Sequence, residues 1–111
     1  MNKFQRGQMW WFTPATTGAP DEILKLRPCI IVSNNLLNST SNTLIVVPLS
    51  TKIEVEQPVH IPIICNGTES VVYCERIQRV HVCQIKEFIG VCDKGEMVDI
   101  DEGIRNALSL Y

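Results

Sequence analysis

Two polar groups stand at the ends of the most apolar segments of this sequence. Arg27 opens the run RPCIIV, and Ser50 and Thr51 close the run TLIVVPL. An unpaired guanidinium is costly in an apolar setting, so Arg27 must reach solvent or hold an anion. A fixed cation beside hydroxyl donors suits a phosphodiester. The competing interpretation is structural: Arg27 forms a salt bridge with Asp21 or Glu22, and the hydroxyls belong to a simple turn.

Signatures of metal or nucleotide chemistry are missing from the sequence. Neither histidine has a partner at metal-ligand spacing, and no glycine-rich phosphate loop or nucleophile elbow occurs. The five cysteines form no C-x-x-C pair, and most stand among β-branched neighbours. This pattern favours buried thiols in a reducing cytoplasm. We therefore expect no metal and no cofactor.

Length and charge narrow the class of protein. The 111 residues are enough for one domain, which we place at residues 1–111. The net charge of −2 excludes a strongly basic polyanion binder, although it allows a local basic patch. No apolar run approaches the roughly 20 residues that span a bilayer, and no secretory leader is seen. These features predict a cytoplasmic protein that does not enter membranes.

Short β-rich runs separated by turn signals recur along the chain. Asn66-Gly67 is a strong tight-turn dipeptide between two such runs. Residues 14–26 and 33–42 read as polar connecting loops. The expected strands are residues 8–12, 27–32, 43–49, 59–63, 70–77 and 80–85.

The last segment changes to a helical period. Asp93 stands three residues before Glu96, which is the spacing of a capping box. Apolar residues then recur at steps of three and four, and Gly103 weakens the helix by up to about 1 kcal/mol, so the helix must be stabilised by docking. We expect a mainly β fold, a small curled antiparallel barrel of five to seven strands with a C-terminal α-helix over one opening.

Several blocks, taken in order, resemble the MazF/PemK toxins of bacterial toxin–antitoxin systems. The resemblance spans nearly the whole chain, and the arginine-proline strand followed by VVPLS is its most specific part. The blocks are RGQMWW at 6–11, Gly18 with Glu22, LRPCIIVSN at 26–34, TLIVVPLST at 43–51, SVVYCERIQ at 70–78 and the helix at 93–110.

The resemblance implies an SH3-like barrel of the CcdB/PemK type that forms a homodimer. It implies an endoribonuclease that cuts single-stranded RNA, chiefly mRNA, at short sequence motifs without a metal. The ribose 2′-OH would attack, leaving a 2′,3′-cyclic phosphate and a 5′-OH. It also implies a cognate antitoxin whose disordered C-terminal tail occupies the RNA groove.

Catalytic roles carry over to four positions, and a histidine is an alternative base. Arg27 matches the family's catalytic arginine, and an electrostatic role on the phosphate suits it because an unperturbed guanidinium is a poor acid. Ser50 matches the catalytic threonine, with Thr51 as the second choice. Glu75 falls on the acidic residue of the PemK-like branch and is a candidate general base. His60 is the other candidate base.

A wider set of positions is implied in substrate binding. The usual EQIR block reads ERIQ here, so Arg76 and Gln78 present exchanged groups. Because the two are separated by two positions, we expect them on one face of a strand. The exchange bears on base specificity more than on chemistry. The implied substrate-binding residues are Glu22, Pro28, Asn34, His60, Arg76, Gln78 and Arg79.

A second function remains open at this point. CcdB-like poisons share the barrel and act without catalysis, by binding a protein target such as DNA gyrase. The acidic net charge and the exchanged pair favour that alternative slightly, and a homologue that keeps only the fold is a third possibility. Trp10, Trp11 and Phe88 are candidates either for a dimer surface or for the core.

Overall fold

The computed structural model describes residues 3–14, 25–51 and 57–110, so the predicted loop residue Glu22 lies outside the described part. The described residues form seven strands, two α-helices and two short 3-10 turns. Their bounds are β1 Gln8–Phe12, β2 Arg27–Ile31, α1 Asn35–Thr40, β3 Thr43–Ser50, β4 His60–Cys65, β5 Thr68–Tyr73, η1 Cys74–Arg76, β6 Gln78–His81, η2 Val82–Gln84, β7 Ile85–Val91 and α2 Lys94–Leu108.

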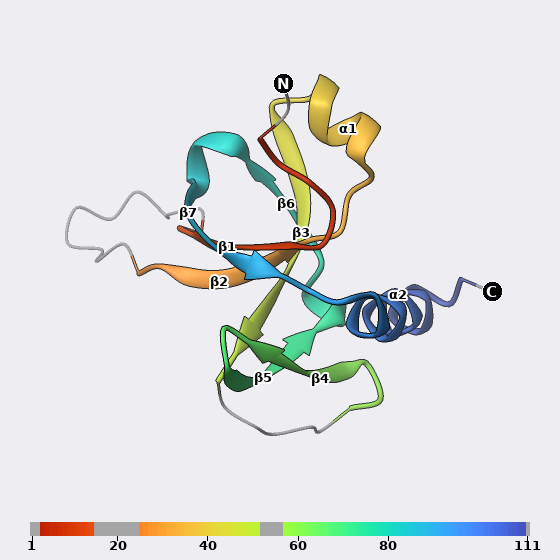
Figure 1. Cartoon of the computed structure of the whole chain (residues 1–111). Helices are drawn as coiled ribbons and strands as arrows, with labels where there is room; N and C mark the ends of the chain where they lie inside the picture. The colour runs from red at the N-terminus through yellow and green to blue at the C-terminus, as the bar shows by residue number, and fades with distance from the viewer. Residues whose placement is uncertain (1–2, 15–24, 52–56, 111) are drawn as a thin grey trace.

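The strands form one curled antiparallel sheet in the order β4-β5-β3-β2-β1-β7, with β6 also paired to β3 (Figure 1). Strand β3 is the longest and holds the two halves together. Residues 43–46 of β3 pair with β6, and residues 49–50 pair with β5, while β2 occupies the opposite edge. The expected mainly β, curled antiparallel fold with a C-terminal helix is confirmed.

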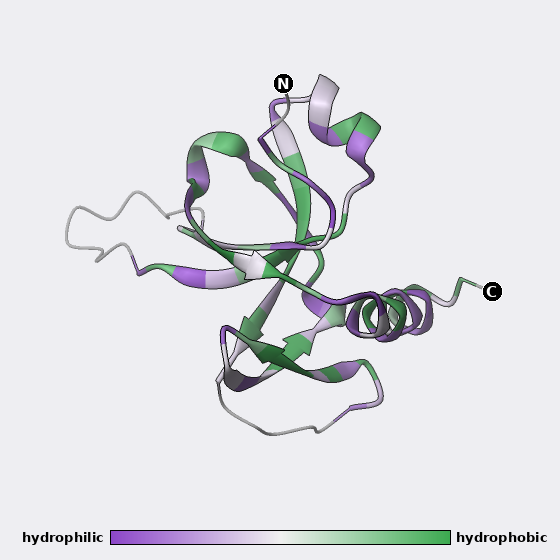
Figure 2. Cartoon of the chain, in the orientation of Figure 1, coloured by the Kyte–Doolittle hydropathy of each residue, from purple (hydrophilic) through white to green (hydrophobic). Residues whose placement is uncertain are grey.

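Alternation along the strands divides the core in two. In β2, Cys29 and Ile31 pack inside the curl with β1, β3, β6 and β7, whereas Ile30 points the other way. In β3, Val46 lies inside the curl and Val47 on the opposite face. That opposite face packs against α2, and the strands are coloured as mostly hydrophobic where the two layers meet (Figure 2). Side-chain parity therefore decides which face each site residue joins.

Helix α2 begins as the sequence predicts. The carboxylate of Asp93 accepts from the Glu96 backbone N–H, and Glu96 reaches back to the Asp93 N–H. The second oxygen of Glu96 accepts from the Ile64 N–H of β4 at 2.8 Å. Ile100 is fully buried against the sheet. Gly103 lies against η1, where an added Cβ would stand 2.7 Å from Cys74 Sγ.

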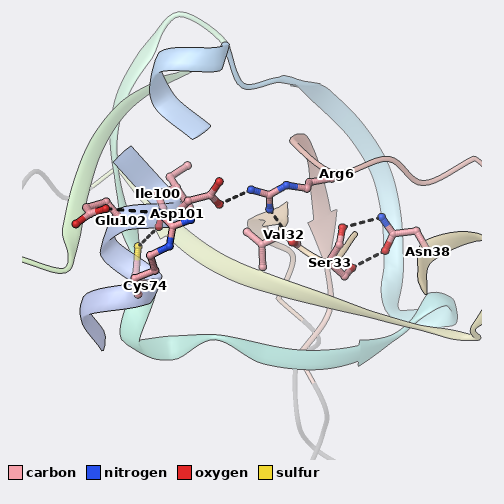
Figure 3. Close-up of polar contacts among 9 residues, drawn as sticks. Arg6, Val32, Ser33, Asn38, Cys74, Ile100, Asp101 and Glu102 are labelled. Atoms are coloured by element: carbon pink, nitrogen blue, oxygen red, sulfur yellow. Dashed lines mark hydrogen bonds and ion pairs between the residues drawn. The ribbon is translucent and has the colours of Figure 1, made fainter. Parts of the chain in front are cut away.

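The segment before β1 is fastened to α2 by one arginine. The guanidinium of Arg6 pairs with Asp101 on the helix and also donates to the Val32 carbonyl at 2.7 Å (Figure 3). In the same view, the buried Asn38 of α1 bonds Ser33, which anchors the helix to the end of β2. Polar side chains thus fix the connections that the apolar core does not hold.

Four elements differ from the sequence prediction. Residues 33–42 contain α1, capped by Asn34, rather than only a loop. The strand expected over residues 70–77 ends at Tyr73 and turns through η1 before β6 begins. The last strand, β7, was not predicted, and the expected strand at 80–85 is divided between β6 and η2.

Aromatic and cysteine side chains fall into core and surface groups. Trp10 is buried and packs edge-to-face on Phe88, whose own ring is half exposed. Four cysteines are buried, as expected from their neighbours, and Cys83 is exposed. In the described part of the chain, no helix has both the length and the apolar character that a membrane crossing requires.

Candidate active site

Arg27 and Ser50 end the two central strands of the sheet. Arg27 begins β2, opposite Phe12 of β1. Cys29 of β2 pairs with Pro48 of β3. Two residues further along each strand, the same register sets Arg27 opposite Ser50. By parity both side chains belong to the inner face of the curl, and Arg27 is exposed at its rim. The sequence prediction that these two groups lie at one rim agrees with this register.

The guanidinium of Arg27 makes no ion pair or hydrogen bond with any residue in the described ranges. The salt bridge weighed above, with Asp21 or Glu22, falls outside those ranges. An exposed guanidinium at a strand end is free to hold an anion bidentately. This electrostatics suits a phosphate arriving from solvent.

Thr51 does not share this face. It follows Ser50, so its side chain turns to the opposite side, where it lines a pocket of about 260 Å³ together with Pro28 and Leu49. Pro28 likewise faces away from Arg27. Of the two hydroxyls proposed from the sequence, Ser50 is the one that parity places with Arg27.

Histidine and glutamate form a close pair beside these strands. His60 Nε2 lies 2.7 Å from Glu75 Oε2, and the imidazole is 6% exposed against 38% for the Glu75 side chain. The ring of Tyr73 meets the imidazole edge-to-face at 4.8 Å between centroids. Arg76 in turn lies over the Tyr73 ring at 4.5 Å. The four side chains form one connected cluster at the junction of β4, β5 and η1.

The pair belongs to the same sheet face as Ser50. Ser50 pairs with Val71 on β5, and Tyr73, two residues further along β5, pairs with His60 on β4. Paired residues and residues two apart share a face of an antiparallel sheet. The face that carries Arg27 and Ser50 therefore continues across β5 to His60.

The carboxyl of Glu75 is held in its charged form. Its partial burial favours the neutral acid, but the hydrogen bond with His60, helped by a backbone hydrogen bond and by the nearby charges of His60 and Arg76, outweighs this and lowers its pKa. With Glu75 ionised, His60 Nε2 is the donor. The cluster thus presents the Glu75 carboxylate as a negatively charged acceptor that His60 holds in place, with Arg76 next to it.

The remaining predicted residues are dispersed. Asn34 caps α1, where its side chain accepts from the Leu37 N–H at 2.8 Å. Arg76 lies in η1 and Gln78 in β6, so the expectation that both lie on one face of a strand is wrong; η1 breaks the alternation between them. Arg79 is exposed on β6 and faces away from Gln78.

Buried thiols are poor candidates for nucleophiles here. Burial raises the pKa of Cys29 and of Cys92 to about 12, and that of Cys74 to about 11. Within the described ranges, His, Cys, Asp and Glu side chains do not gather in threes that would hold a metal ion. The arginine, hydroxyl and carboxylate groups of this face are therefore the candidates for chemistry.

Sequence reasoning found the members of the His60–Glu75 pair but not their contact. The two residues are 15 positions apart, and no local pattern links them. The β4–β5 hairpin register, set by the Asn66-Gly67 turn, and the turn at η1 bring them together. The Thr51 pocket was also missed, because its lining comes from strands far apart in sequence, and one of them, β7, was not predicted.

Comparisons with known proteins agree with this fold. A sequence model described as PemK-like, MazF-like toxin of type II toxin–antitoxin system matches residues 5–108. No curated protein matches the chain by sequence. An endoribonuclease from a mycobacterial species is similar in structure at 23% identity, with a TM-score of 0.80 over 99% of this chain and 95% of that one.

Two further solved structures come from toxin–antitoxin complexes. An endoribonuclease in complex with its cognate antitoxin, also from a mycobacterial species, has 22% identity and a TM-score of 0.79 over 96% of each chain. A chain of a MazE–MazF structure from Deinococcus radiodurans has 11% identity and a TM-score of 0.79 over 96% of this chain and 97% of that one. At these identities the structural likeness establishes the fold. Because the family match covers nearly the whole chain, the protein belongs to the PemK-like, MazF-like toxins of type II toxin–antitoxin systems.

Proposed function

We propose that this MazF-like toxin is a metal-independent endoribonuclease that cleaves single-stranded RNA, chiefly mRNA, at short sequence motifs. Support comes first from family membership and from relatives named as endoribonucleases. The observation that carries the proposal is the register that sets Arg27 opposite Ser50 on one face, with the guanidinium exposed. A cation and a hydroxyl donor at open strand ends are the groups that bind a phosphodiester.

The reaction needs no nucleophile from the protein. The ribose 2′-oxygen forms a bond to phosphorus, and the bond from phosphorus to the 5′-oxygen breaks. The 2′-OH gives its proton to a base, and the departing 5′-oxygen takes up a proton, which leaves a 2′,3′-cyclic phosphate and a 5′-OH. Arg27 offsets the second negative charge of the phosphorane, and Ser50 Oγ donates a hydrogen bond to it.

Glu75 is the proposed proton acceptor. It is ionised, partly exposed and fixed by His60, which is itself buried and so better suited to holding Glu75 than to meeting RNA. The same face would continue from phosphate binding at Arg27 to proton transfer at Glu75. We propose that the RNA strand also contacts the exposed Arg76, Gln78 and Arg79. Glu22, Pro28 and Asn34 are retained as RNA contacts from the family resemblance, whereas His60 positions Glu75.

A homodimer in the cytoplasm, neutralised by an antitoxin whose disordered tail fills the RNA-binding face, completes the proposal. Structures of relatives include complexes with antitoxins, which supports an antitoxin partner. Exposed apolar side chains on α2, including Val98 at 66% exposed, support a protein contact on that helix. Residues 1–111 act in this proposal as a single toxin domain.

Arginine substitutions test the proposal. Arg27→Ala should lower kcat for RNA cleavage by at least about 10²-fold, the usual effect of losing one donor to a developing oxyanion. Arg105→Ala is the matched control, because Arg105 is exposed on α2 and only loosely paired with Glu102 at 3.6 Å. Cleavage of labelled RNA is followed with EDTA present, the new ends are identified by mass spectrometry, and circular dichroism verifies folding.

Two results would overturn it. An Arg27→Ala protein that cleaves RNA at the wild-type rate would remove Arg27 from the chemistry. A wild-type protein that leaves RNA intact but stalls a topoisomerase would show a CcdB-like, gyrase-binding toxin instead.

A further inference from the structure

Tyr73 connects the buried and the exposed members of the cluster at the junction of β4, β5 and η1. Tyr73 and His60 pair across the β4–β5 hairpin, and their rings meet edge-to-face with an interplanar angle of 87°. The Cζ atom of Arg76 lies over the same Tyr73 ring, 4.5 Å from its centroid. Tyr73 is half-buried, whereas Arg76 is exposed. A ring that is fixed by its strand therefore holds a cation at the surface.

The N–H donors of the Arg76 guanidinium are unused. Within the described ranges this guanidinium makes no ion pair or hydrogen bond, and only the Arg76 backbone carbonyl is bonded, by the Gln78 amide at 3.3 Å. Arg6 is held differently, because its donors are taken by Asp101 and by the Val32 carbonyl. An aromatic ring attracts a cation through its π face and does not consume the N–H groups that bind an anion. Arg76 is therefore available for binding, and Arg6 is not.

Glu75 is next to Arg76 in the chain but does not pair with it. The Glu75 carboxylate is bound to His60 at 2.7 Å, while the Arg76 guanidinium lies on the Tyr73 ring. Among the ion pairs of the described residues, none joins Glu75 to Arg76. An exposed ion pair is weak, so a cation–π contact of similar strength is enough to keep the two groups apart. The carboxylate stays open to a proton, and the guanidinium stays open to an anion.

The place of this cation agrees with the proposed path of the RNA. Tyr73 belongs to the sheet face that carries Arg27 and Ser50. An RNA strand carries one phosphate per nucleotide, so a strand held at Arg27 offers further anions along this face. We propose that Tyr73 is a positioning residue, whose ring holds the Arg76 guanidinium away from Glu75 and presents its free N–H groups to a phosphate of the bound RNA. The inference rests on the proposed RNA cleavage.

Two substitutions at Tyr73 separate the ring from its hydroxyl group. Tyr73→Leu keeps an apolar side chain but removes the ring, so the affinity for single-stranded RNA should fall about 2- to 30-fold, the range expected for one cation–π contact. Tyr73→Phe keeps the ring and should restore most of that affinity. Fluorescence anisotropy measures binding to a short 2′-O-methyl RNA of mixed sequence, which has no 2′-OH to attack and therefore stays intact. With cleavable RNA, Tyr73→Leu should raise KM more than it lowers kcat.

A double-mutant cycle with Arg76 gives a readout that a merely structural role would not change. Arg76→Ala should weaken binding and make the plot of log affinity against log salt concentration less steep by about 0.7, the value for one phosphate contact on a single strand. Adding Tyr73→Leu to Arg76→Ala should weaken binding no further, because the ring then has no cation to hold. Arg105→Ala is the matched control, since it removes the same charge from an exposed position on α2 and should leave the slope unchanged. Circular dichroism verifies that each variant is folded.

The outcomes are distinct. Wild-type affinity in Tyr73→Leu, or an equal loss from Tyr73→Leu with and without the Arg76 side chain, would overturn the inference and leave the nuclease proposal intact. A Tyr73→Phe protein that binds as weakly as Tyr73→Leu would assign the effect to the hydroxyl group and would overturn it as well. A wild-type protein that neither binds nor cuts RNA overturns the proposed function itself.

Discussion

Gly103→Ala is the substitution for which two opposing effects can be weighed from the structure. In a helix interior, alanine is favoured over glycine by about 1 kcal/mol. At this position, however, the new Cβ would stand 2.7 Å from Cys74 Sγ and 3.1 Å from Ile61 Cγ1. Overpacking of that kind typically costs about 1–3 kcal/mol. The net expectation is a protein that is destabilised by up to about 2 kcal/mol.

Urea unfolding measures the effect, with two comparisons that isolate its cause. Gly95→Ala, in the same helix, meets only Asp93 Oδ1 at 3.4 Å and should be neutral or stabilising by up to about 1 kcal/mol. In a Cys74→Ala background the sulfur is absent and only the contact with Ile61 remains, so Gly103→Ala should destabilise less than it does in the unmodified protein. If Gly103→Ala stabilises the unmodified protein by about 1 kcal/mol, the close approach of α2 to η1 inferred here is incorrect.

Three further outcomes are expected. His60→Ala should raise the pKa of Glu75 toward its ordinary value of 4.5, which NMR titration can follow. In the wild-type protein, the ionised Glu75 contributes folding stability above pH 4.5, and this contribution is lost as the pH falls through the lowered pKa. The loss should be smaller in the variant. Asp101→Asn should lower stability by less than about 1 kcal/mol and lessen its salt dependence, because its pair with Arg6 is about one-third exposed; a Tm unchanged at all salt concentrations would contradict this. Cys83 should react first with a thiol reagent, and equal rates at all five cysteines before unfolding would show that the other four are not buried.

The sequence predicts best where one strong local signal dominates. Asp93 and Glu96 form the capping box that their spacing indicates, and the arginine-proline and VVPL runs are central strands. In contrast, α1 has only six residues and one buried side chain, Asn38, so it leaves no apolar stripe. Strand β7 is an edge strand with few buried positions. Its sequence therefore lacks the alternation of apolar and polar residues by which a strand is predicted.

The site follows the same division. That Arg27 and Ser50 share a face follows from period-two alternation once β2 and β3 are paired. The direct contact between His60 and Glu75 depends on the register of a hairpin and on η1, because β5 ends two residues before Glu75 and the chain turns there. Gly103 looked only like a weakness of the helix, whereas it is the residue that lets Cys74 approach.

The carboxylate of Glu96 has a consequence for how this protein behaves when crowded. Strand β4 is an edge strand of the sheet. Edge strands with unpaired backbone N–H groups can pair with strands of other molecules. The Glu96 carboxylate accepts a hydrogen bond from the Ile64 N–H, so this N–H is not available to an added strand. An incoming strand would have to displace a charged side chain to pair here. A residue that starts a helix thereby also guards against fibrous self-association, and its loss should favour insoluble protein.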